Sequence, residues 1–550
     1  MNDLGPFRHT FNSDVFAARY QSDGARTWWD LARILARRVC GPFLTDEEVA
    51  EVEWAIAEMY FLPGGRYLYY AARDAAFFNN CYLLRSEEDS REDWGETAKK
   101  ATLCLMTGGG IGNDYSVYRP KGARLGRTGG VSSGPLPAMH KVNEIGRAAI
   151  QGGGRRAAVY ASLDREHADI RDFLVMKNWD EMVIPGTNGA TYGDAKKADF
   201  MFPAPMDHTN ISVNYSDEWL GLDDPAADEI FLLNCEQALR TAEPGFSFNF
   251  GDKARETLRN ACTEVTSEDD SDVCNLGSLN LSRIPDRETL QRVIRAATKF
   301  LVCGTLVAEL PYQKVYEVRE KNRRLGLGIM GVHEWLLQRG ERYEVTAELH
   351  EWLSDYRDIS DEVSAATADR LEISRPVANR AVAPTGTIGI MAGTTTGIEP
   401  LFAVAYLRRF MRGTEVFQQF VVDPVAKEIV ERTGVDPDTI ETAIDLAADP
   451  ERRLAFQADV QDYVDMAISS TINLPEWGSD LNNADKVPEF ARLLAKYAPR
   501  LRGFTCYPNG ARGGQPLTAV PYQEALAKEG VEMKATDICD ISGKGGTCGI

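Results

Sequence analysis

The sequence contains no long apolar run. No stretch approaches the eighteen or more apolar residues of a membrane-spanning helix, and the opening residues, MNDLGPFRHTFNSD, lack the apolar core of a signal peptide. We therefore predict a cytoplasmic protein with no membrane partner.

Positive charge is scarce relative to negative charge. The chain has 61 Lys and Arg against 82 Asp and Glu, which gives a formal net charge of −21. This excess disfavours direct binding to nucleic acid, which is itself a polyanion. An anionic ligand must instead be met by local basic residues or by backbone amides.

The sequence also lacks paired cysteine motifs and internal repeats. Its ten cysteines include no CxxC pair, so zinc ribbons and fingers fit poorly, and we predict no resident metal ion. Ten cysteines in a large, reduced protein are not a disulfide framework. No repeat appears at the periods of solenoids or propellers.

What is present is the composition of a large globular protein. The 550 residues are 44 % hydrophobic and 26 % charged, enough for a large core, either in one large single-core enzyme or in two to three domains. The first 75 residues look helical, and Thr45 with Glu48 forms a capping-box pattern. Short apolar runs, such as 211–215 and 245–250, then alternate with helical patterns, such as 288–310. This alternation predicts an α/β barrel or a doubly wound sheet.

Three glycine-rich segments lie close together at 107–114, 126–135 and 151–156. Each could be a cluster of turns. Because Arg119, Lys121, Arg124 and Arg127 are interspersed with them, we interpret them as loops that bind phosphates.

The segment NACTE, residues 260–264, combines an amide, a thiol and a carboxylate. In an extended backbone Asn260, Cys262 and Glu264 share one face, because side chains alternate with period two. Together they could hold a sugar diol, with the carboxylate accepting a proton and the thiol performing redox or radical chemistry. The alternative is a buried cysteine flanked by surface polar groups.

Other candidate groups are more ambiguous. Cys81 and Cys274 adjoin apolar runs, so each fits either a small core residue or one half of a redox pair. The segment Pro384–Thr387 predicts a loop that enters a helix N-terminus and binds phosphate, or a plain capped turn. Cys539 and Cys548 lie on the last forty residues, where a thiol-exchange role is favoured over exposed thiols without function.

In combination these motifs resemble the large subunit of ribonucleotide reductase. The resemblance rests on ordered segments over about residues 60–520, namely NNCYLL, GGGIG, RPKG, TGGVSSGP, QGGGRR, NACTE, CNLGSLNL, RRLGLGIMG, PTGTIGIMAGTTTGIEP, STINLP and FTCYPNGAR. It implies a ten-stranded α/β barrel of two parallel five-stranded halves joined antiparallel, with a central finger loop. We expect an N-terminal helical region at 1–75, the barrel at 76–515 and a redox-active tail at 516–550.

The resemblance assigns a role to each candidate. Cys262 matches the thiyl-radical cysteine that takes the 3′ hydrogen, Glu264 the general base on the 3′-hydroxyl, and Asn260 the amide that orients the substrate. Cys81 and Cys274 match the pair that reduces the 2′ position and becomes a disulfide. Further residues are implied for the sugar (Asn80), the phosphates (Thr385, Gly386 and Thr387) and re-reduction of the active-site disulfide (Cys539 and Cys548).

The radical source implied is adenosylcobalamin. PTGTIGIMAGTTTGIEPLFAVAYLRR and RGFTCYPNGARGGQPL resemble the class II enzymes, and Cys506-Tyr507 replaces the adjacent tyrosines of the class I radical relay. One alternative is a class I subunit that needs a ferritin-like radical-generating partner. Another is a nucleotide-binding barrel without chemistry, although such a regulator would have no need for five redox and acid–base groups.

The resemblance also implies ligands and partners. These are ribonucleoside diphosphate substrates, dNTP or ATP specificity effectors near Glu88 and Arg119, and a thioredoxin- or glutaredoxin-like reductant. Helices near 91–106 and 136–150 resemble a homodimer interface, and 151–156 the loop that links effector to substrate. The chain is short for the family, like compact phage-encoded forms acting in an infected host cell. Residues 184–208 look like an insertion, and 64–70 depart from the usual substrate loop.

Overall fold

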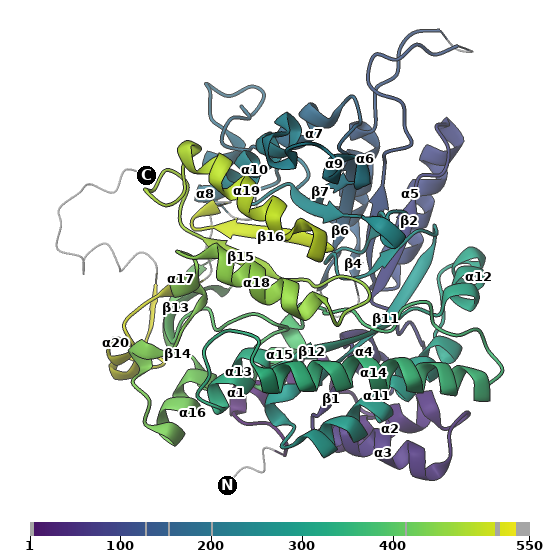
Figure 1. Ribbon diagram of the computed structural model, residues 1–550, viewed down its shortest axis with the longest axis vertical. Helices are drawn as coiled ribbons and strands as arrows, with labels where there is room; N and C mark the ends of the chain where they lie inside the picture. The colour runs from purple at the N-terminus through teal and green to yellow at the C-terminus, as the bar shows by residue number, and fades with distance from the viewer. Residues whose placement is uncertain are drawn as a thin grey trace.

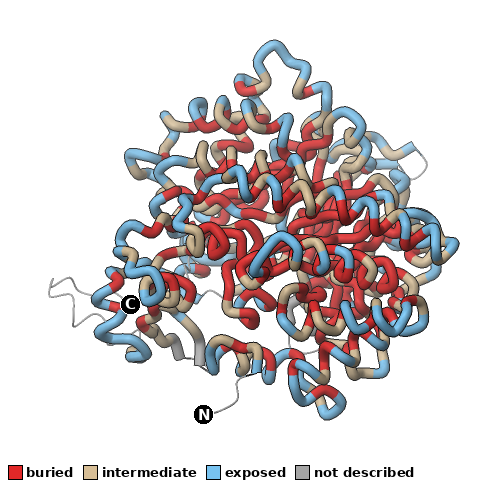
Figure 2. The backbone as a smooth tube through the Cα atoms, turned by 60° about the horizontal axis from the view of Figure 1, so that its bottom comes forward, coloured by how far each residue is buried: buried red, intermediate tan, exposed pale blue. Residues whose placement is uncertain are grey.

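The computed structural model describes residues 5–126, 129–151, 155–199, 202–412, 415–511 and 517–534. Strands occupy the middle of the molecule and helices surround them (Figure 1). Buried residues concentrate in that interior, and exposed residues lie on the outer loops and helices (Figure 2). Among the described residues, none of the helices combines the length and apolarity that a membrane crossing needs.

Five parallel strands form the first half of the main sheet. In spatial order they are β2 (Cys81–Arg85), β3 (Gly110–Asp114), β6 (Val159–Asp164), β7 (Thr209–Tyr215) and β8 (Gly245–Phe248). Their residues are mostly buried, as expected where helices cover a parallel sheet. The covering helices include α5 (Arg91–Met106), α6 (Leu136–Ala148), α7 (Ile170–Val175) and α10 (Glu229–Thr241).

The second half runs antiparallel to the first. It contains β11 (Asp272–Asn280), β12 (Leu325–Met330), β15 (Thr471–Leu474) and β16 (Gly503–Pro508). Strand β11 pairs parallel with β12, and β15 with β16. The halves meet where β2 pairs antiparallel with β11 and β8 with β16.

A short segment connects the two ends of this sheet. Residues 378–382 form a parallel bridge to β12 through Leu327 and Arg380, and another to the chain entering β15 through Val382 and Ile468. Backbone hydrogen bonds accompany both bridges. Counting this segment, ten strands follow one another in two parallel halves joined antiparallel, which confirms the predicted barrel fold.

A hairpin lies inside this ring of strands. Strands β9 (Leu258–Arg259) and β10 (Thr266–Ser267) pair antiparallel. The amide of Asn210 on β7 donates to the carbonyl of Ala261 (3.2 Å), and the Ala467 amide donates to the carbonyl of Glu264 (2.9 Å). Because these contacts come from both halves, the hairpin is the predicted finger loop.

Helices pack against one side of the barrel, and their buried residues form one apolar cluster with residues of β11 and β12. They are α1 (Thr10–Arg19), α2 (Trp28–Cys40), α3 (Asp46–Ala57), α11 (Arg287–Val307) and α14 (Ala347–Arg370). The predicted capping box of Thr45 and Glu48 starts α3, and α11 occupies the helix expected at 288–310. The helical character of the N-terminal region is thus confirmed, while strand β1 (Phe61–Pro63) of this region pairs with β11.

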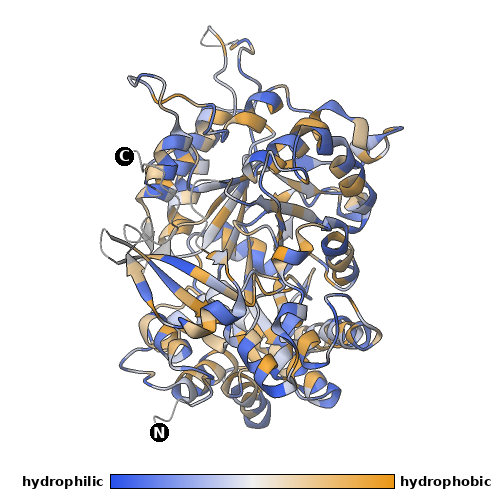
Figure 3. Ribbon diagram, turned by 90° about the vertical axis from the view of Figure 1, so that its left-hand side faces the viewer, coloured by the Kyte–Doolittle hydropathy of each residue, from blue (hydrophilic) through white to orange (hydrophobic). Residues whose placement is uncertain are grey.

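A separate four-stranded sheet lies beside the barrel. Its order is β17 (Leu517–Ala519), β13 (Ala405–Arg412), β14 (Glu415–Val422) and β18 (Glu532–Lys534), with α16 (Pro424–Thr433) and α20 (Tyr522–Ala527) beside it. Asp423 caps α16, as its Asp-Pro sequence predicts. Figure 3 shows hydrophilic and hydrophobic residues mixed along this sheet and along the outer helices.

Candidate active site

Cys81 and Cys274 face each other across two antiparallel strands. They are directly opposed residues of β2 and β11, and both are buried. Opposed residues of an antiparallel pair lie on the same face at a Cα separation that a disulfide can span. A side chain at Gly326 would come within 2.9 Å of the Cys274 sulfur, so this glycine leaves room for the thiol. The structure therefore brings together two cysteines whose proximity their spacing in the sequence could not show.

Both thiols are strongly held in their protonated form. Burial raises the pKa of Cys81 well above its usual range, and the carboxylate of Glu264 raises it further. Burial and the neighbouring Asp272 do the same for Cys274. The pair is suited to supply hydrogen and electrons rather than to act as a thiolate nucleophile.

The segment with Asn260, Cys262 and Glu264 forms the turn between β9 and β10. The extended backbone on which we based their common face is wrong, because Thr263 has a left-handed φ of +70° and donates its N–H to the Asn260 carbonyl (3.0 Å). A left-handed residue breaks the alternation of side chains. The turn, not a strand, gathers these groups.

Asn260 connects the turn to the cysteine pair. Its side-chain nitrogen donates to the sulfur of Cys81 at 2.9 Å, and its side-chain oxygen accepts from the Val265 amide at 3.0 Å. The Cys81 thiol in turn donates to Oε1 of Glu264 at 3.8 Å. Asn260 and Glu264 are therefore buried and bonded to a thiol, which rules against the alternative that they are surface groups around a core cysteine, but the thiol that they bond is Cys81 and not the Cys262 of their own segment.

Glu264 has the environment of a general base that works near neutral pH. Its side chain is 1 % exposed, and Oε2 has no hydrogen-bond partner within the described parts of the chain. Burial raises its pKa to about 7, although hydrogen bonds from Asn260 and Cys81 oppose this. A base with this pKa can take a proton from a bound hydroxyl near neutral pH.

Cys262 differs from the other two thiols of the site. It lies at the tip of the turn and is partly exposed, whereas Cys81 and Cys274 are buried. It is thus the thiol that a ligand or cofactor can reach from outside the cysteine pair.

The glycine-rich segment 107–114 is a loop only in its first part. Its second part is strand β3, and the glycines allow the finger hairpin to approach. A side chain at Gly112 would lie 1.9 Å from the carbonyl oxygen of Arg259, and one at Gly110 would lie 2.9 Å from Cβ of Ala261. The prediction of a loop was wrong for 110–114, because glycine serves close backbone approach as well as turns. Phosphate binding by 107–109 stays a prediction.

Arg259 is a site residue that our sequence reasoning missed. It is buried, and its guanidinium donates to Oδ1 of Asn249 (2.8 Å) and to the carbonyl of Arg502 (3.0 Å). Burial, together with the nearby Arg502, lowers its pKa to about 9. It anchors the first strand of the hairpin to β8 and β16, and its only sequence signal is its place directly before Asn260.

The segment at 384–387 enters a helix, as predicted. Helix α15 (Gly386–Ala392) follows Thr385, which is buried with φ +48° and accepts at Oγ1 from the Gly397 amide (2.8 Å). Gly386 and Thr387 are exposed at the start of the helix. The assignment of phosphate binding to them stays a prediction.

Asn80 lies directly before Cys81 and presents an unsatisfied polar atom. Its Oδ1 is buried without a hydrogen-bond partner in the described structure. A side chain at Gly64 would lie 3.0 Å from this oxygen. An acceptor in this position suits a sugar hydroxyl, and that role stays a prediction.

The expected effector residues lie on the outer surface. Glu88 is exposed just before α5, and Arg119 forms an ion pair with Asp89. Helices α5 and α6 occupy the ranges predicted for the dimer pair and pack against each other. Their roles in effector binding and dimerisation stay predictions.

Two further predictions concern segments that the structure describes in part or not at all. Strands β4 (Ile150–Gln151) and β5 (Arg155–Arg156) pair at the ends of the expected effector loop, while 152–154 lie outside the described residues. Cys539 and Cys548 also lie outside them.

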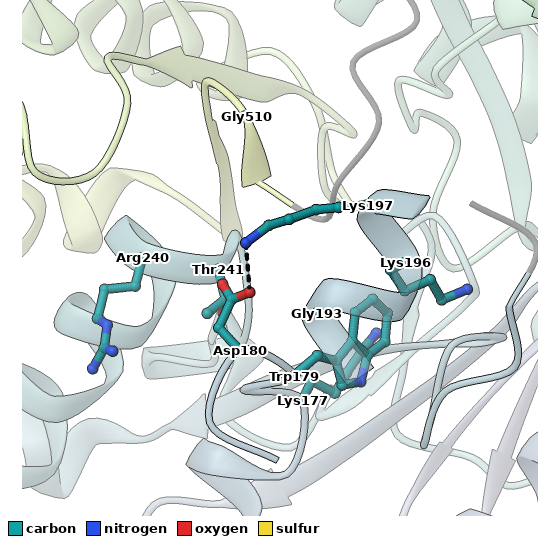
Figure 4. Close-up of a pocket in the computed structure, with 9 residues that line it drawn as sticks. All are labelled: Lys177, Trp179, Asp180, Gly193, Lys196, Lys197, Arg240, Thr241 and Gly510. Carbon is teal, nitrogen blue, oxygen red and sulfur yellow. Dashed lines mark hydrogen bonds and ion pairs between the residues drawn. The ribbon is translucent and has the colours of Figure 1, made fainter. Parts of the chain in front are cut away.

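The segment 184–208, which we predicted to be an insertion, contains helix α8 (Tyr192–Ala198). It packs beside Trp179, and the ammonium groups of Lys177 and Lys196 lie 5.6 and 5.5 Å from the centroid of the Trp179 ring. Figure 4 shows the small pocket formed there, lined by Lys177, Trp179, Asp180, Gly193, Lys196, Lys197, Arg240, Thr241 and Gly510.

The cations around this pocket pair with carboxylates of the chain. Lys197 donates to Asp180 at 3.1 Å across the pocket. Lys177 pairs with Glu243, and Lys196 lies 3.4 Å from Asp207. Lys197 thus joins the segment 184–208 to Asp180 outside it, whereas the Lys196–Asp207 pair lies within the segment and the Lys177–Glu243 pair lies outside it.

Comparison with known proteins agrees with this geometry. The family described as "Ribonucleotide reductase, barrel domain" matches residues 79–220, 246–351 and 377–498. A "Vitamin B12-dependent ribonucleoside-diphosphate reductase" of Mycobacterium tuberculosis is 30 % identical over 529 residues, which cover 87 % of this chain and 74 % of the relative. A protein of the same name from Thermoplasma acidophilum is 28 % identical, over 85 % of this chain and 66 % of the relative.

A phage protein is also similar. The "Putative adenosylcobalamin-dependent ribonucleoside-triphosphate reductase" of Mycobacterium phage D29 is 27 % identical, with 82 % of this chain and 75 % of the relative covered. The family match spans both halves of the barrel and includes Cys81, Asn260, Cys262, Glu264 and Cys274. The chain therefore belongs to the ribonucleotide reductase family.

Proposed function

We propose that this protein reduces ribonucleoside diphosphates to 2′-deoxyribonucleotides by thiyl-radical chemistry that adenosylcobalamin starts. The observation that carries the proposal is the meeting of Asn260 and Glu264 with Cys81, which directly opposes Cys274. The names of the relatives support the cofactor.

Each group has one part in the proposed reaction. The Cys262 thiyl radical takes the 3′ hydrogen atom, and Glu264 accepts the 3′-hydroxyl proton while the 2′-hydroxyl leaves as water with a proton from a thiol. Cys81 and Cys274 together supply two electrons and become a disulfide. Cys262 returns its hydrogen to the 3′ carbon, so the net change is ribonucleotide plus dithiol to deoxyribonucleotide, disulfide and water.

The proposed cofactor must act on a thiol that it can reach. When bound, adenosylcobalamin supplies the one-electron oxidising equivalent that turns the Cys262 thiol into a thiyl radical. Cys262 fits this requirement because it is the partly exposed thiol of the three. Burial of Glu264 and of the cysteine pair keeps the reacting groups away from water.

Ligand and partner assignments follow from the same proposal. Asn80 contacts the sugar, and Thr385, Gly386 and Thr387 hold the phosphates. Glu88 and Arg119 contribute to a dNTP or ATP effector site beside the α5–α6 face of a homodimer. Cys539 and Cys548 pass electrons from a thioredoxin- or glutaredoxin-like reductant to the Cys81–Cys274 disulfide.

The test is anaerobic nucleotide reduction by the purified chain alone. CDP and ADP are supplied with dithiothreitol and with dTTP or dATP, with and without adenosylcobalamin, and CTP and ATP serve as the triphosphate comparison. Deoxynucleotide that forms only with the cofactor supports the proposal. Binding of nucleotide without product would overturn it in favour of a class I subunit that needs a radical-generating partner. Preferential reduction of CTP would overturn the diphosphate assignment.

A further inference from the structure

The finger hairpin is too short to fix its own tip. Strands β9 and β10 have two residues each, and the turn between them, 260–265, is longer than either strand. An isolated two-stranded hairpin is marginally stable at best. The reaction, however, requires that Cys262 and Glu264 be held to within a fraction of an ångström. The positioning must therefore come from contacts outside the hairpin.

Four charged residues converge behind β10. Glu256, Asp272, Arg324 and Arg502, which we call the hairpin clamp, come from the chain before β9 and from the starts of β11, β12 and β16. Nε of Arg324 lies 2.6 Å from Asp272 and its Nη1 lies 3.7 Å from Glu256, while Arg502 lies 3.0 Å from Glu256. All four side chains are at most 12 % exposed.

Each carboxylate of the clamp accepts a hydrogen bond from a hydroxyl group of the hairpin. Thr266 Oγ1 donates to Glu256 Oε2 at 2.5 Å, and Ser267 Oγ donates to Asp272 Oδ2 at 2.7 Å. These are the two residues of β10, and Glu264 precedes the first of them by two positions. Arg324, placed between the two carboxylates, thus fixes both anchoring points relative to each other.

Glu256 remains charged in the folded protein. Burial opposes ionisation of Glu256, but Arg324 and Arg502 outweigh it and lower its pKa to about 2. A buried ion network of this kind is weak evidence for stability, because desolvation offsets the Coulomb attraction. Charged hydrogen-bond acceptors are nevertheless strong and directional, so the network is well suited to fix a geometry.

We propose that Thr266 and Ser267, held by the hairpin clamp, are positioning residues that keep Glu264 and Cys262 in register with Cys81 and Cys274. The inference rests on the proposed function, because it assigns the effect to the chemical step. It adds residues that touch neither substrate nor cofactor. Asn80 and Thr385–Thr387, which we propose to hold the nucleotide, are not among the partners of the clamp in the described structure, so kcat should fall while KM is retained.

The decisive variant is Thr266→Val with Ser267→Ala, which removes both hydroxyls and leaves every ion pair in place. Asp272 keeps Arg324 and Asn322 as donors, and Glu256 keeps Arg502, so no buried carboxylate is left without a partner. Arg324→Lys is a second variant, which retains the charge but cannot reach both carboxylates. Thr442→Val is the control, because it removes a similar hydroxyl-to-carboxylate bond, to Asp445 at 2.6 Å, in a helix cap elsewhere.

Three measurements are compared among parent, variants and control. We expect kcat to fall at least about tenfold in the double variant with KM unchanged, since the loss is confined to the transition state. A loosened turn admits water to Glu264 and lowers its pKa, so the rise of kcat with pH should move to lower pH. Amide hydrogen exchange in 260–265 should become at least about tenfold faster, while the rest of the barrel keeps its protection.

Hydrogen exchange separates this inference from the proposed function, since it needs no turnover. If the parent is inactive but exchange at 260–265 accelerates in the variants, the reductase proposal fails and the clamp stands as an anchor of the turn. If exchange, kcat and its pH dependence all match those of the parent, the clamp has no positioning role. A uniform loss of protection across the barrel would likewise overturn the inference, because it would show a general structural role.

Discussion

The two halves of the candidate active site are held in different ways. Cys81 and Cys274 lie on β2 and β11, inside the main sheet, where backbone pairing fixes their opposition. Asn260, Cys262 and Glu264 lie on a turn that contains the left-handed residue Thr263. The first arrangement follows from the barrel itself, whereas the second depends on side-chain contacts from several strands.

This difference matches the role that we propose for each half. A dithiol that becomes a disulfide needs a fixed spacing, which opposed strands supply without special residues. A base and a hydrogen-abstracting thiol must instead lie inside the barrel, away from its strands, where no regular strand can place them. We therefore expect changes in the turn, or in the side chains that hold it, to affect hydrogen abstraction and proton transfer. Changes in the Cys81–Cys274 pair should affect the supply of electrons.

The largest effect should come from Cys262→Ser, which removes the thiol of the turn. A serine hydroxyl cannot form a comparable radical, so turnover should fall by at least about 10⁴-fold while nucleotide binding is retained. Product formation and equilibrium binding of CDP measure the two properties, with Cys40→Ser, a buried thiol on α2, as the control. Appreciable activity in Cys262→Ser would show that the turn does not start the reaction.

The next change, Cys274→Ser, disrupts only the half of the site formed by Cys81 and Cys274 on β2 and β11. Without an external reductant the parent should form deoxynucleotide in proportion to its cysteine pairs, and the variant should form at least about 10³-fold less because no Cys81–Cys274 disulfide can form. Product yield and thiol titration are the measurements. A variant that keeps the parental yield would assign the reducing equivalents to other cysteines.

A third change disturbs the contact between strand β3 of the barrel and the finger hairpin. Gly112→Ala places a Cβ 1.9 Å from the Arg259 carbonyl, so the hairpin must move. Overpacking of this kind costs roughly 1–3 kcal/mol, and a displaced turn should lower kcat by about 10²-fold. Kinetics and urea unfolding check the two effects.

Gly503→Ala is the matched control, because it also adds a methyl group to a buried barrel strand but meets its nearest atom at 3.4 Å. Equal losses in both variants would mean that any added methyl group disturbs the barrel, and that the glycines of β3 have no special relation to the hairpin.

The same contrast explains what the sequence could reveal. The start of α3 and the position of α11 agree with the predictions, because caps and apolar periodicity are local signals. The opposition of Cys81 and Cys274 depends on pairing between distant strands, so only the resemblance to a family suggested it. The turn at 260–265 was misjudged as extended because the φ of Thr263 has no signature in its residue type, and Arg259 and the hairpin clamp are single charged residues that only the fold brings together.

The smallest expected effect is on the free energy of unfolding, and it comes from the titration of Glu264. Its pKa of about 7 exceeds the ordinary 4.5 because of burial. A carboxyl with a raised folded-state pKa stabilises the fold fully below its ordinary pKa, and this contribution is lost as pH rises through about 7. Glu264→Gln removes the titration, so the variant should be more stable than the parent at pH 8 by on the order of 2 kcal/mol, with a smaller difference at pH 5. It should also be nearly inactive, since the base is gone. Urea unfolding at the two pH values measures the difference, with Glu341→Gln as an exposed control. A difference that does not change with pH would mean that Glu264 titrates normally, and that the turn is as open to water as an ordinary surface loop.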